Sequence, residues 1–147
     1  MADPKKLTAY DTTPYPSQAH PTTHIRVLET TGALFGMSPK PISRCRVLEL
    51  GCASGMNLVP QALDFPKSEF LGIDLSSRQI GEAKRLAKDL GARNVEFRHA
   101  DIMEVDASWG EFDYIICHGI LSWVPDEVQE KIFGVFQTNL TPQGVAI

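Results

Sequence analysis

The chain has 147 residues, of which 43% are hydrophobic and 22% are charged, and its formal net charge is -4. These values are typical of a soluble globular domain with its own core, and they argue against nucleic-acid binding. No apolar run reaches the ~20 residues that cross a bilayer, and no secretion signal is recognisable. Three cysteines without metal-ligand spacing predict a reduced, cytoplasmic location and no metal site.

The first 20 residues form a polar arm rich in proline and threonine, and no regular structure is expected there. One interpretation is a tail that takes no part in function. The other is a lid in which Tyr15, standing between two prolines, closes over a bound ligand. Residues 21–147 are predicted to form one domain, whose first element is a helix from Pro21 to about Phe35.

Five short apolar runs predict the strands of one sheet. These runs lie at Arg46–Leu50, Phe70–Asp74, Asn94–Arg98, Phe112–Cys117 and Val145–Ile147. Segments with helical periodicity lie at Met56–Asp64, Ser76–Leu90 and Val124–Leu140, and residues 141–144 are predicted to be a turn. Alternating strands and helices predict an α/β fold, in which helices cover both faces of a mainly parallel sheet.

The spacing of apolar residues also predicts which side of each helix is buried. Phe35 is expected on the buried side of the first helix, Leu90 on that of the third and Phe133 on that of the last. Ser76 and Gln79 have the spacing of a capping box, which would start the third helix.

The first strand runs directly into the small-residue turn Gly51–Gly55, after which a helix is predicted. Such a turn presents backbone N–H groups and the positive end of a helix to a ligand, and glycine allows the tight bend. Position 56 is Met, so the dinucleotide pattern G-x-G-x-x-G is incomplete, and no phosphate-binding G-K-[ST] follows. Asp74, at the tip of the second strand, is placed to accept the two hydroxyls of a ribose; the alternative is an unrelated surface acid.

Four segments, in order, resemble the sequence motifs of class I S-adenosylmethionine-dependent methyltransferases. These segments are Glu49–Gly55, Gly72–Ser76, His99–Ile102 and Phe112–Gly119. Three further segments resemble bacterial methyltransferases that carry a methyltransferase regulatory domain, a group similar to bacterial protein-lysine methyltransferases acting on outer-membrane proteins. They are Pro14–Ser17, Thr23–His24 and His118–Val124. Ala53 departs from the broad family, which usually has glycine at this position.

The resemblance implies a Rossmann-like, doubly wound sheet of strand order 3-2-1-4-5, with two further strands of the family missing. The chain is therefore expected to be the N-terminal part of a longer protein. The implied cofactor is S-adenosylmethionine, and the product is S-adenosylhomocysteine (AdoHcy). The residues expected to bind the cofactor are Glu49, Gly51, Cys52, Ala53, Ser54, Gly55, Asn57, Asp74, Leu75, Gln79, Ala100, Asp101, Ile102, Cys117, His118 and Gly119.

Within that set the resemblance assigns approximate roles. The turn Gly51–Gly55 would hold the methionine end of the cofactor, and Asp74 the ribose. Asp101 would lie near the adenine, although a turn cap is its alternative role. His118 and Gly119 would lie near the sulfonium.

The predicted reaction is methyl transfer to a nucleophile, of which a protein lysine is one candidate. The acceptor itself, a protein or a small molecule, is not identified by the sequence. His118 is a candidate base for a lysine ammonium, and its alternative role is to shape the pocket. Trp123 is a candidate for lining the acceptor site, and its alternative is a core aromatic. Tyr15 belongs to the same set through the lid interpretation.

Two other functions stay open at this point. One is a non-catalytic module that binds S-adenosylmethionine and only regulates a partner; the other, less favoured, is a protein of related topology that binds NAD or another nucleotide. The open sheet edge predicts either a homo-oligomer or missing C-terminal domains that cover it. Cys52 and Cys117 end neighbouring strands, so they are either buried packing residues, the favoured interpretation, or a redox-sensitive pair.

Overall fold

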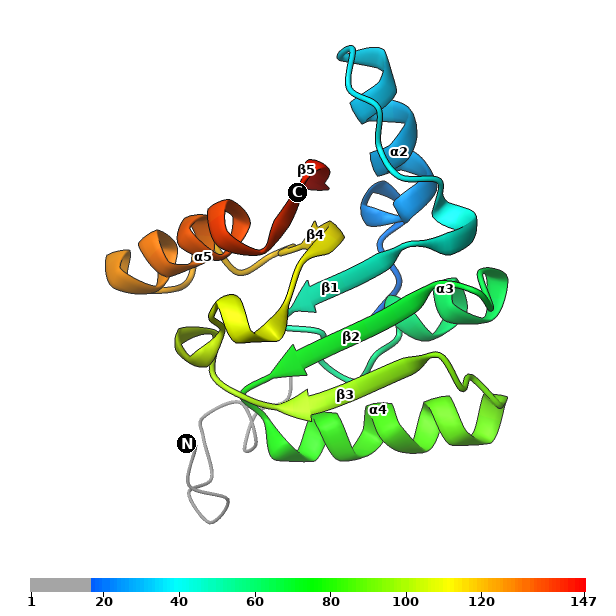
Figure 1. Cartoon of the computed structure of the whole chain (residues 1–147). Helices are drawn as coiled ribbons and strands as arrows, with labels where there is room; N and C mark the ends of the chain where they lie inside the picture. Colours follow the sequence, from blue (N-terminus) through cyan, green and yellow to red (C-terminus); the bar gives the residue numbers. More distant parts are fainter. Residues whose placement is uncertain (1–16) are drawn as a thin grey trace.

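The computed structural model describes residues 17–147, so Tyr15 and the arm before it lie outside the described residues. Its centre is a parallel sheet with the strand order β3-β2-β1-β4-β5, seen from bottom to top in Figure 1. The strands are β1 (Arg46–Leu50), β2 (Glu69–Asp74), β3 (Val95–His99), β4 (Phe112–Ile116) and β5 (Leu140–Ala146). The α/β class and the predicted strand order are confirmed.

Helices cover both faces of this sheet, as predicted. The α-helices are α2 (Ile25–Leu34), α3 (Leu58–Asp64), α4 (Ser77–Leu90) and α5 (Asp126–Asn139). Short 3-10 turns connect other elements at η1 (Pro21–Thr23), η2 (Ile42–Arg44), η3 (Ile102–Glu104) and η4 (Ala107–Trp109). A break at His24 separates η1 from α2. It arises because the His24 ring accepts the backbone N–H of Arg26 and caps the start of α2.

Two apolar layers form because successive side chains of a strand point to opposite faces. On one face, α2, α3 and α4 bury Ile25, Leu58 and Ile80 in the layer that includes Val47 and Tyr114 of the sheet. On the other face, Ile132 and Val135 of α5 join a layer whose strand members include Leu48, Leu50, Ile73 and Ile115. The sheet is therefore sandwiched between two cores, which is why its strands are apolar almost throughout.

Helix α4 begins and ends as its sequence indicates. The Ser76 hydroxyl accepts the backbone N–H of Gln79 at 3.2 Å, which is half of the predicted capping box. In a complete capping box, the side chain of Gln79 would accept the backbone N–H of Ser76. This N–H donates to Asp74 Oδ1 at 2.8 Å. At the other end Gly91 adopts a left-handed conformation (φ 73°), and this ends the helix.

Three predicted core residues are exposed instead. Phe35 is 83% exposed because α2 ends at Leu34, and the buried position belongs to Gly32, against which Pro39 and Val145 pack closely. Leu90 is exposed in the last turn of α4, next to the Gly91 that ends the helix.

The prediction for Phe133 is wrong for a different reason. The buried face of α5 contains Ile132, Val135 and Asn139, so it is rotated away from Phe133. Asn139 is buried because its amide donates to the carbonyls of Asp106 and Gly110, a tertiary contact that apolar periodicity does not reveal.

Strand β5 also begins earlier than predicted, since residues 141–144 belong to it rather than to a turn. Leu140 pairs with Phe112 and Val145 with Tyr114, so the register shifts between these pairs and leaves a bulge. An edge position and a bulge are the two places in a sheet that tolerate proline, which explains Pro142 within this strand.

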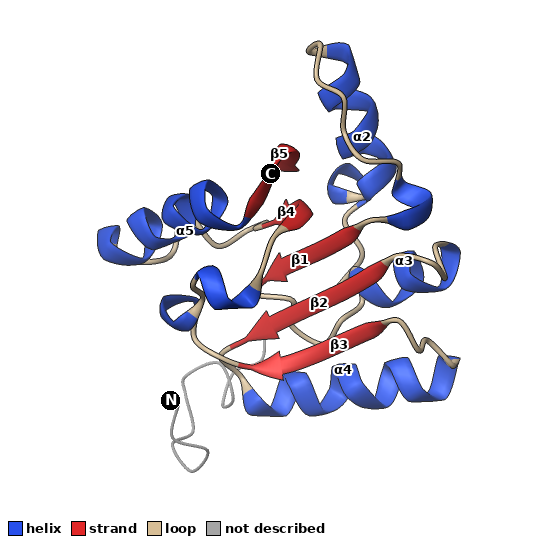
Figure 2. Cartoon of the chain, in the orientation of Figure 1, coloured by secondary structure: helices blue, strands red, loops and turns tan. Residues whose placement is uncertain are grey.

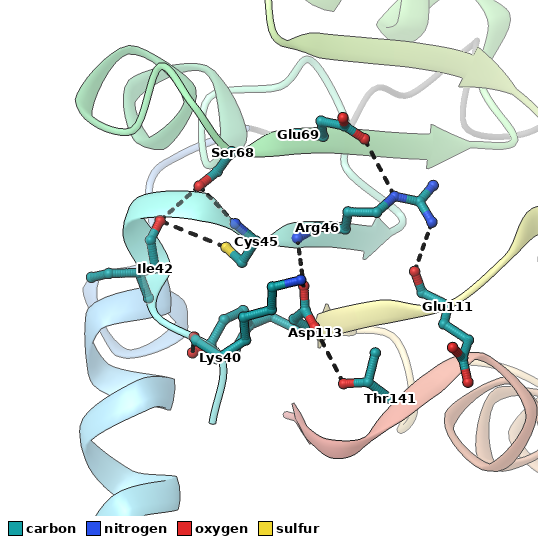
Figure 3. Close-up of polar contacts among 10 residues, drawn as sticks. Lys40, Ile42, Cys45, Arg46, Ser68, Glu69, Glu111, Asp113 and Thr141 are labelled. Carbon is teal, nitrogen blue, oxygen red and sulfur yellow. Dashed lines mark hydrogen bonds and ion pairs between the residues drawn. The ribbon is translucent and has the colours of Figure 1, made fainter. Parts of the chain in front are cut away.

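The buried acid Asp113 links three strands at the end of the sheet where the strands begin. Asp113 Oδ2 accepts the backbone N–H of Arg46 at 2.8 Å, and Asp113 Oδ1 accepts the Thr141 hydroxyl at 3.3 Å (Figure 3). The Lys40 ammonium lies 3.9 Å from the same carboxylate. These contacts hold β1, β4 and β5 together at the end of the sheet opposite the carboxyl ends of the strands.

We expect Asp113→Ala to lower the free energy of unfolding by about 2 kcal/mol, because the N–H of Arg46 loses its acceptor at a partly buried site. Urea denaturation measures this change. Glu111→Ala, on the exposed loop beside it, is the control and should change stability by less than ~0.5 kcal/mol. Equal stability of the two variants would contradict the structural role of Asp113.

Candidate functional site

The predicted site residues follow the carboxyl ends of four neighbouring strands. The arrowheads of β1, β2 and β3 point to the same side in Figure 2, because parallel strands end at one edge. Backbone hydrogen bonds join the loops there: Cys52 N–H to the Ile73 carbonyl at 2.9 Å, and Ala100 N–H to the Asp74 carbonyl at 3.2 Å. The loops after β1, β2 and β3 therefore form one continuous surface.

The turn after β1 is left-handed at three positions, Gly51 (φ 70°), Ala53 (φ 46°) and Gly55 (φ 77°). A Cβ atom on Gly51 would lie 2.2 Å from the side chain of Ile120, and one on Gly55 would lie 2.7 Å from Phe97. Among the described residues, Ala53 is the only non-glycine residue with positive φ. The departure from the family's glycine thus carries backbone strain, because a Cβ atom disfavours the left-handed conformation.

Asp74 joins this turn to the loop after β2. Its Oδ2 accepts the backbone N–H of Ala53 at 2.9 Å, while Oδ1 accepts that of Ser76. The carboxylate is therefore part of the strand-tip surface and not an isolated surface acid. It lies where a ribose was predicted to bind, at the end of the strand beside β1.

Glu49 is the buried acid of the site. Its Oε1 accepts from the Asn57 amide at 2.7 Å, and its Oε2 is buried with no hydrogen-bond partner among the described residues. Burial raises the pKa of Glu49 to about 7; the Asn57 hydrogen bond opposes this rise, and the nearby Asp74 charge adds to it. A buried acceptor of this kind fits a ligand that brings a charged N–H group, as the amino group of a methionine moiety does.

The other residues predicted to bind the cofactor differ in burial and in their contacts. Gln79 and Ala100 are buried, and the carbonyl of Leu75 lies 3.0 Å from Nε2 of His99. Asp101 Oδ1 accepts the N–H of Met103 at 2.9 Å, so Asp101 does cap η3, the alternative considered for it. Ile102 packs against the core layer beneath.

The two cysteines of the site are protonated thiols at neutral pH. Burial raises the pKa of Cys52 well above its ordinary value, and it raises the pKa of Cys117 to about 12. Cys52 Sγ also packs against Gly72, where a Cβ atom would lie 2.8 Å away. These properties support the interpretation of buried packing residues, because thiol oxidation requires accessible thiolate.

The loop after β4 brings polar and aromatic groups to the edge of the site. The ring of His118 lies 4.2 Å from the ring of His20, between centroids, and Gly119 adopts a left-handed conformation beside it. Trp123 is 80% exposed, so the interpretation as a core aromatic is wrong. The backbone N–H of Trp123 donates to the Ile120 carbonyl at 2.8 Å, which forms a turn in the loop after β4.

Sequence reasoning missed three residues that the structure brings to this region, His20, Thr23 and Gln61. Thr23 and Gln61 are buried polar residues, and His20 precedes a proline in the arm. No periodic pattern marks them, since each owes its position to a hydrogen bond with a residue more than 30 positions away in the chain.

Comparison with known proteins identifies the family. The family described as Methyltransferase domain matches residues 42–147, which contain all five strands and the turn Gly51–Gly55. The chain belongs to this methyltransferase family. The predictions of the family, of the Rossmann-like fold and of S-adenosylmethionine as cofactor are confirmed.

Two solved structures and one further sequence are similar to this chain. It is 44% identical to PKMT2 from Rickettsia typhi, whose structure was solved in complex with AdoHcy; the match has a TM-score of 0.87 and covers 90% of this chain and 26% of that one. A methyltransferase from Thiobacillus denitrificans in complex with S-adenosyl-L-homocysteine is 27% identical, with a TM-score of 0.62 over 93% of this chain and 51% of that one. The uncharacterized protein RP789 of Rickettsia prowazekii is 46% identical over 93% of this chain.

The chain spans only part of these relatives, 25% of RP789 and 26% of the PKMT2 chain. No helix among residues 17–147 combines the length and the apolar composition needed to cross a membrane.

The raised pKa of Glu49 predicts a pH-dependent stability of the protein without cofactor. Because the folded-state pKa lies above the ordinary value of 4.5, proton binding stabilises the fold, and this stabilisation is lost as the pH rises through about 7. Relative to the wild type, Glu49→Gln should therefore gain about 1 kcal/mol of unfolding free energy between pH 6 and pH 8.

Urea denaturation at several pH values checks this prediction. Glu130→Gln, at an exposed position of α5, is the matched control, and its difference from the wild type should stay constant over the same range. If the difference between Glu49→Gln and the wild type is also constant, burial does not raise the pKa of the Glu49 carboxylate as described.

Proposed function

We propose that this chain is the catalytic domain of an S-adenosylmethionine-dependent methyltransferase and that the methyl acceptor is a lysine side chain of a protein. The observation that carries the proposal is the buried Oε2 of Glu49, which has no hydrogen-bond partner in the part of the chain that the structure describes. It lies beside a left-handed glycine turn and the strand-tip carboxylate of Asp74. Together these groups match a ligand with a charged amine at one end and a ribose at the other.

In this proposal each part of the site contacts a different part of the cofactor. Glu49 accepts from the amino group of the methionine moiety, and the backbone of Gly51–Gly55 curves around that end. Asp74 accepts the ribose hydroxyls, while Asp101 and Ile102 lie along the adenine. Bound S-adenosylmethionine supplies an activated methyl group on a sulfonium, so the protein's contribution is to align the incoming nucleophile and to exclude water.

The acceptor side is assigned to the loop after β4. A lysine must lose a proton before it can attack, and His118 is an exposed imidazole at the strand tip that can accept one. The exposed face of Trp123 suits the alkyl stem or the cation of a lysine. Support comes from the resemblance to bacterial protein-lysine methyltransferases and from the similarity to PKMT2.

The setting of the domain is part of the same proposal. We infer a bacterial, cytoplasmic protein, because the described thiols are free and the relatives named above are bacterial. A regulatory domain or a second copy would cover the free edge of β5, and no nucleic-acid partner is proposed for a chain of net charge -4.

The first experiment is calorimetric titration of the purified protein with AdoHcy and with NAD. We expect saturable binding of AdoHcy, no binding of NAD, and at least a roughly tenfold weaker AdoHcy affinity in Asp74→Ala, which removes the ribose acceptor. Asp89→Ala, on the exposed side of α4, should bind AdoHcy like the wild type. Binding of NAD, or equal AdoHcy affinity in both variants, would contradict the assigned cofactor site.

Methyl transfer is then measured with methyl-labelled S-adenosylmethionine and a lysine-containing peptide, against the same peptide with arginine. Label in the lysine peptide alone supports the proposal. Cofactor binding without transfer to any acceptor would point to the regulatory module instead, and label in a small molecule would overturn the acceptor assignment.

His118→Ala tests the proposed proton acceptor. With saturating cofactor, we expect kcat for the lysine peptide to fall roughly a hundredfold near pH 7, and the fall to shrink at high pH, where the amine is already deprotonated. A pH-rate profile of kcat measures both effects. If turnover is unchanged across the pH range, His118 is not the base.

A further inference from the structure

The hydroxyl group of Thr23 is buried at the end of η1, where it forms two hydrogen bonds. Its Oγ1 donates to the His20 carbonyl at 3.0 Å and accepts from the Asn57 amide at 3.0 Å. Since Thr23 is fully buried, both contacts are shielded from water and the hydroxyl holds one fixed orientation.

Asn57 stands at the N-cap of α3, yet its side chain does not cap the helix. An asparagine at this position ordinarily accepts an N–H of the first turn. Here Oδ1 accepts the backbone N–H of His20 at 3.0 Å, and Nδ2 donates both to Thr23 and to Glu49 Oε1, the latter at 2.7 Å. The amide is thus directed to Glu49 and to the turn His20–Thr23.

Within residues 17–147, hydrogen bonds hold only one of the two oxygens of the Glu49 carboxylate. The Asn57 amide engages Oε1, which leaves Oε2 buried, unpartnered and fixed in direction. We propose that Asn57 and Thr23 are positioning residues, which orient the Glu49 carboxylate so that Oε2 meets the amino group of the cofactor. This inference rests on the role of Glu49 in the proposed function, and it replaces the direct cofactor contact predicted for Asn57.

Contacts other than those of the Asn57 side chain also hold the helices α2 and α3 on either side of this cluster. Gln61 Nε2 donates to the backbone carbonyl of Asn57 at 2.9 Å, and Gln61 Oε1 accepts the N–H of Ile25 at 3.0 Å. The ring of His20 also lies against that of His118. Substitution of Asn57 should therefore leave α2 and α3 in position, so that loss of binding can be separated from loss of fold.

The same contacts make the pH dependence of binding a specific readout. The Asn57 hydrogen bond lowers the pKa of Glu49, whereas burial and the charge of Asp74 raise it. The thiols of Cys52 and Cys117 also lie close enough to interact electrostatically with Glu49, but their raised pKa values keep them neutral. Removal of the Asn57 amide should move the pH midpoint of cofactor binding upward, because protonated Glu49 does not attract a cationic amine.

The experiment is calorimetric titration of four variants with AdoHcy between pH 6 and pH 9. At pH 7.5 we expect Asn57→Ala to weaken binding roughly tenfold and to move the midpoint upward, as for loss of a charge-assisted hydrogen bond. Thr23→Val should weaken binding about threefold, and Thr23→Ser, which restores the hydroxyl, should bind like the wild type. Thr30→Val, on the exposed side of α2, is the control and should have no effect.

A double-mutant cycle with Glu49→Gln separates positioning from a general structural effect. If Asn57 acts through Glu49, Asn57→Ala should cost little further affinity in the Glu49→Gln background. Full additivity of the two losses, or wild-type affinity and midpoint in Asn57→Ala, would overturn the inference while the cofactor site stands. Wild-type affinity in Glu49→Gln itself would instead overturn the proposed role of Glu49.

Discussion

The candidate site depends on a single buried carboxylate, that of Glu49. Glu49 lies near the end of the central strand, where burial penalises its charge and the hydrogen bond from the Asn57 amide opposes that penalty. Burial of this charge costs free energy of folding, but it keeps the second oxygen, Oε2, inside the protein as a hydrogen-bond acceptor. Groups arranged for a ligand commonly conflict with stability in this way, since the complementary charge arrives only on binding.

The buried acid Asp113 and the proposed cofactor site lie at opposite ends of the same sheet. At the amino ends of the strands, Asp113 finds its partners within the chain, through Arg46 and Thr141. At the carboxyl ends, Asp74 ties together two loops, and the glycine turn brings its backbone close to Ile120. A parallel sheet produces this division, because its strands deliver all their carboxyl ends, and the loops that follow, to one edge.

The two sides of the site differ in how they are built. The cofactor side consists of buried groups and backbone turns on rigid strands, which suits a ligand of constant shape. The side assigned to the acceptor consists of an exposed loop with His118 and Trp123, and it meets the turn at His20. Exposed loops vary without disturbing the core, so one fold can present the same cofactor to different acceptors.

The five strands, the turn Gly51–Gly55 and the acid Asp74 can be predicted from the sequence, because they are local patterns. The strand order and the cofactor class followed from the resemblance of these motifs to a known family. It did not determine that Phe133 is exposed, that β5 starts at Leu140, or that Asn57 bonds to Glu49 and Thr23. These features become visible in the folded chain, since each depends on a partner distant in sequence. Periodicity describes how a segment repeats but not what it packs against.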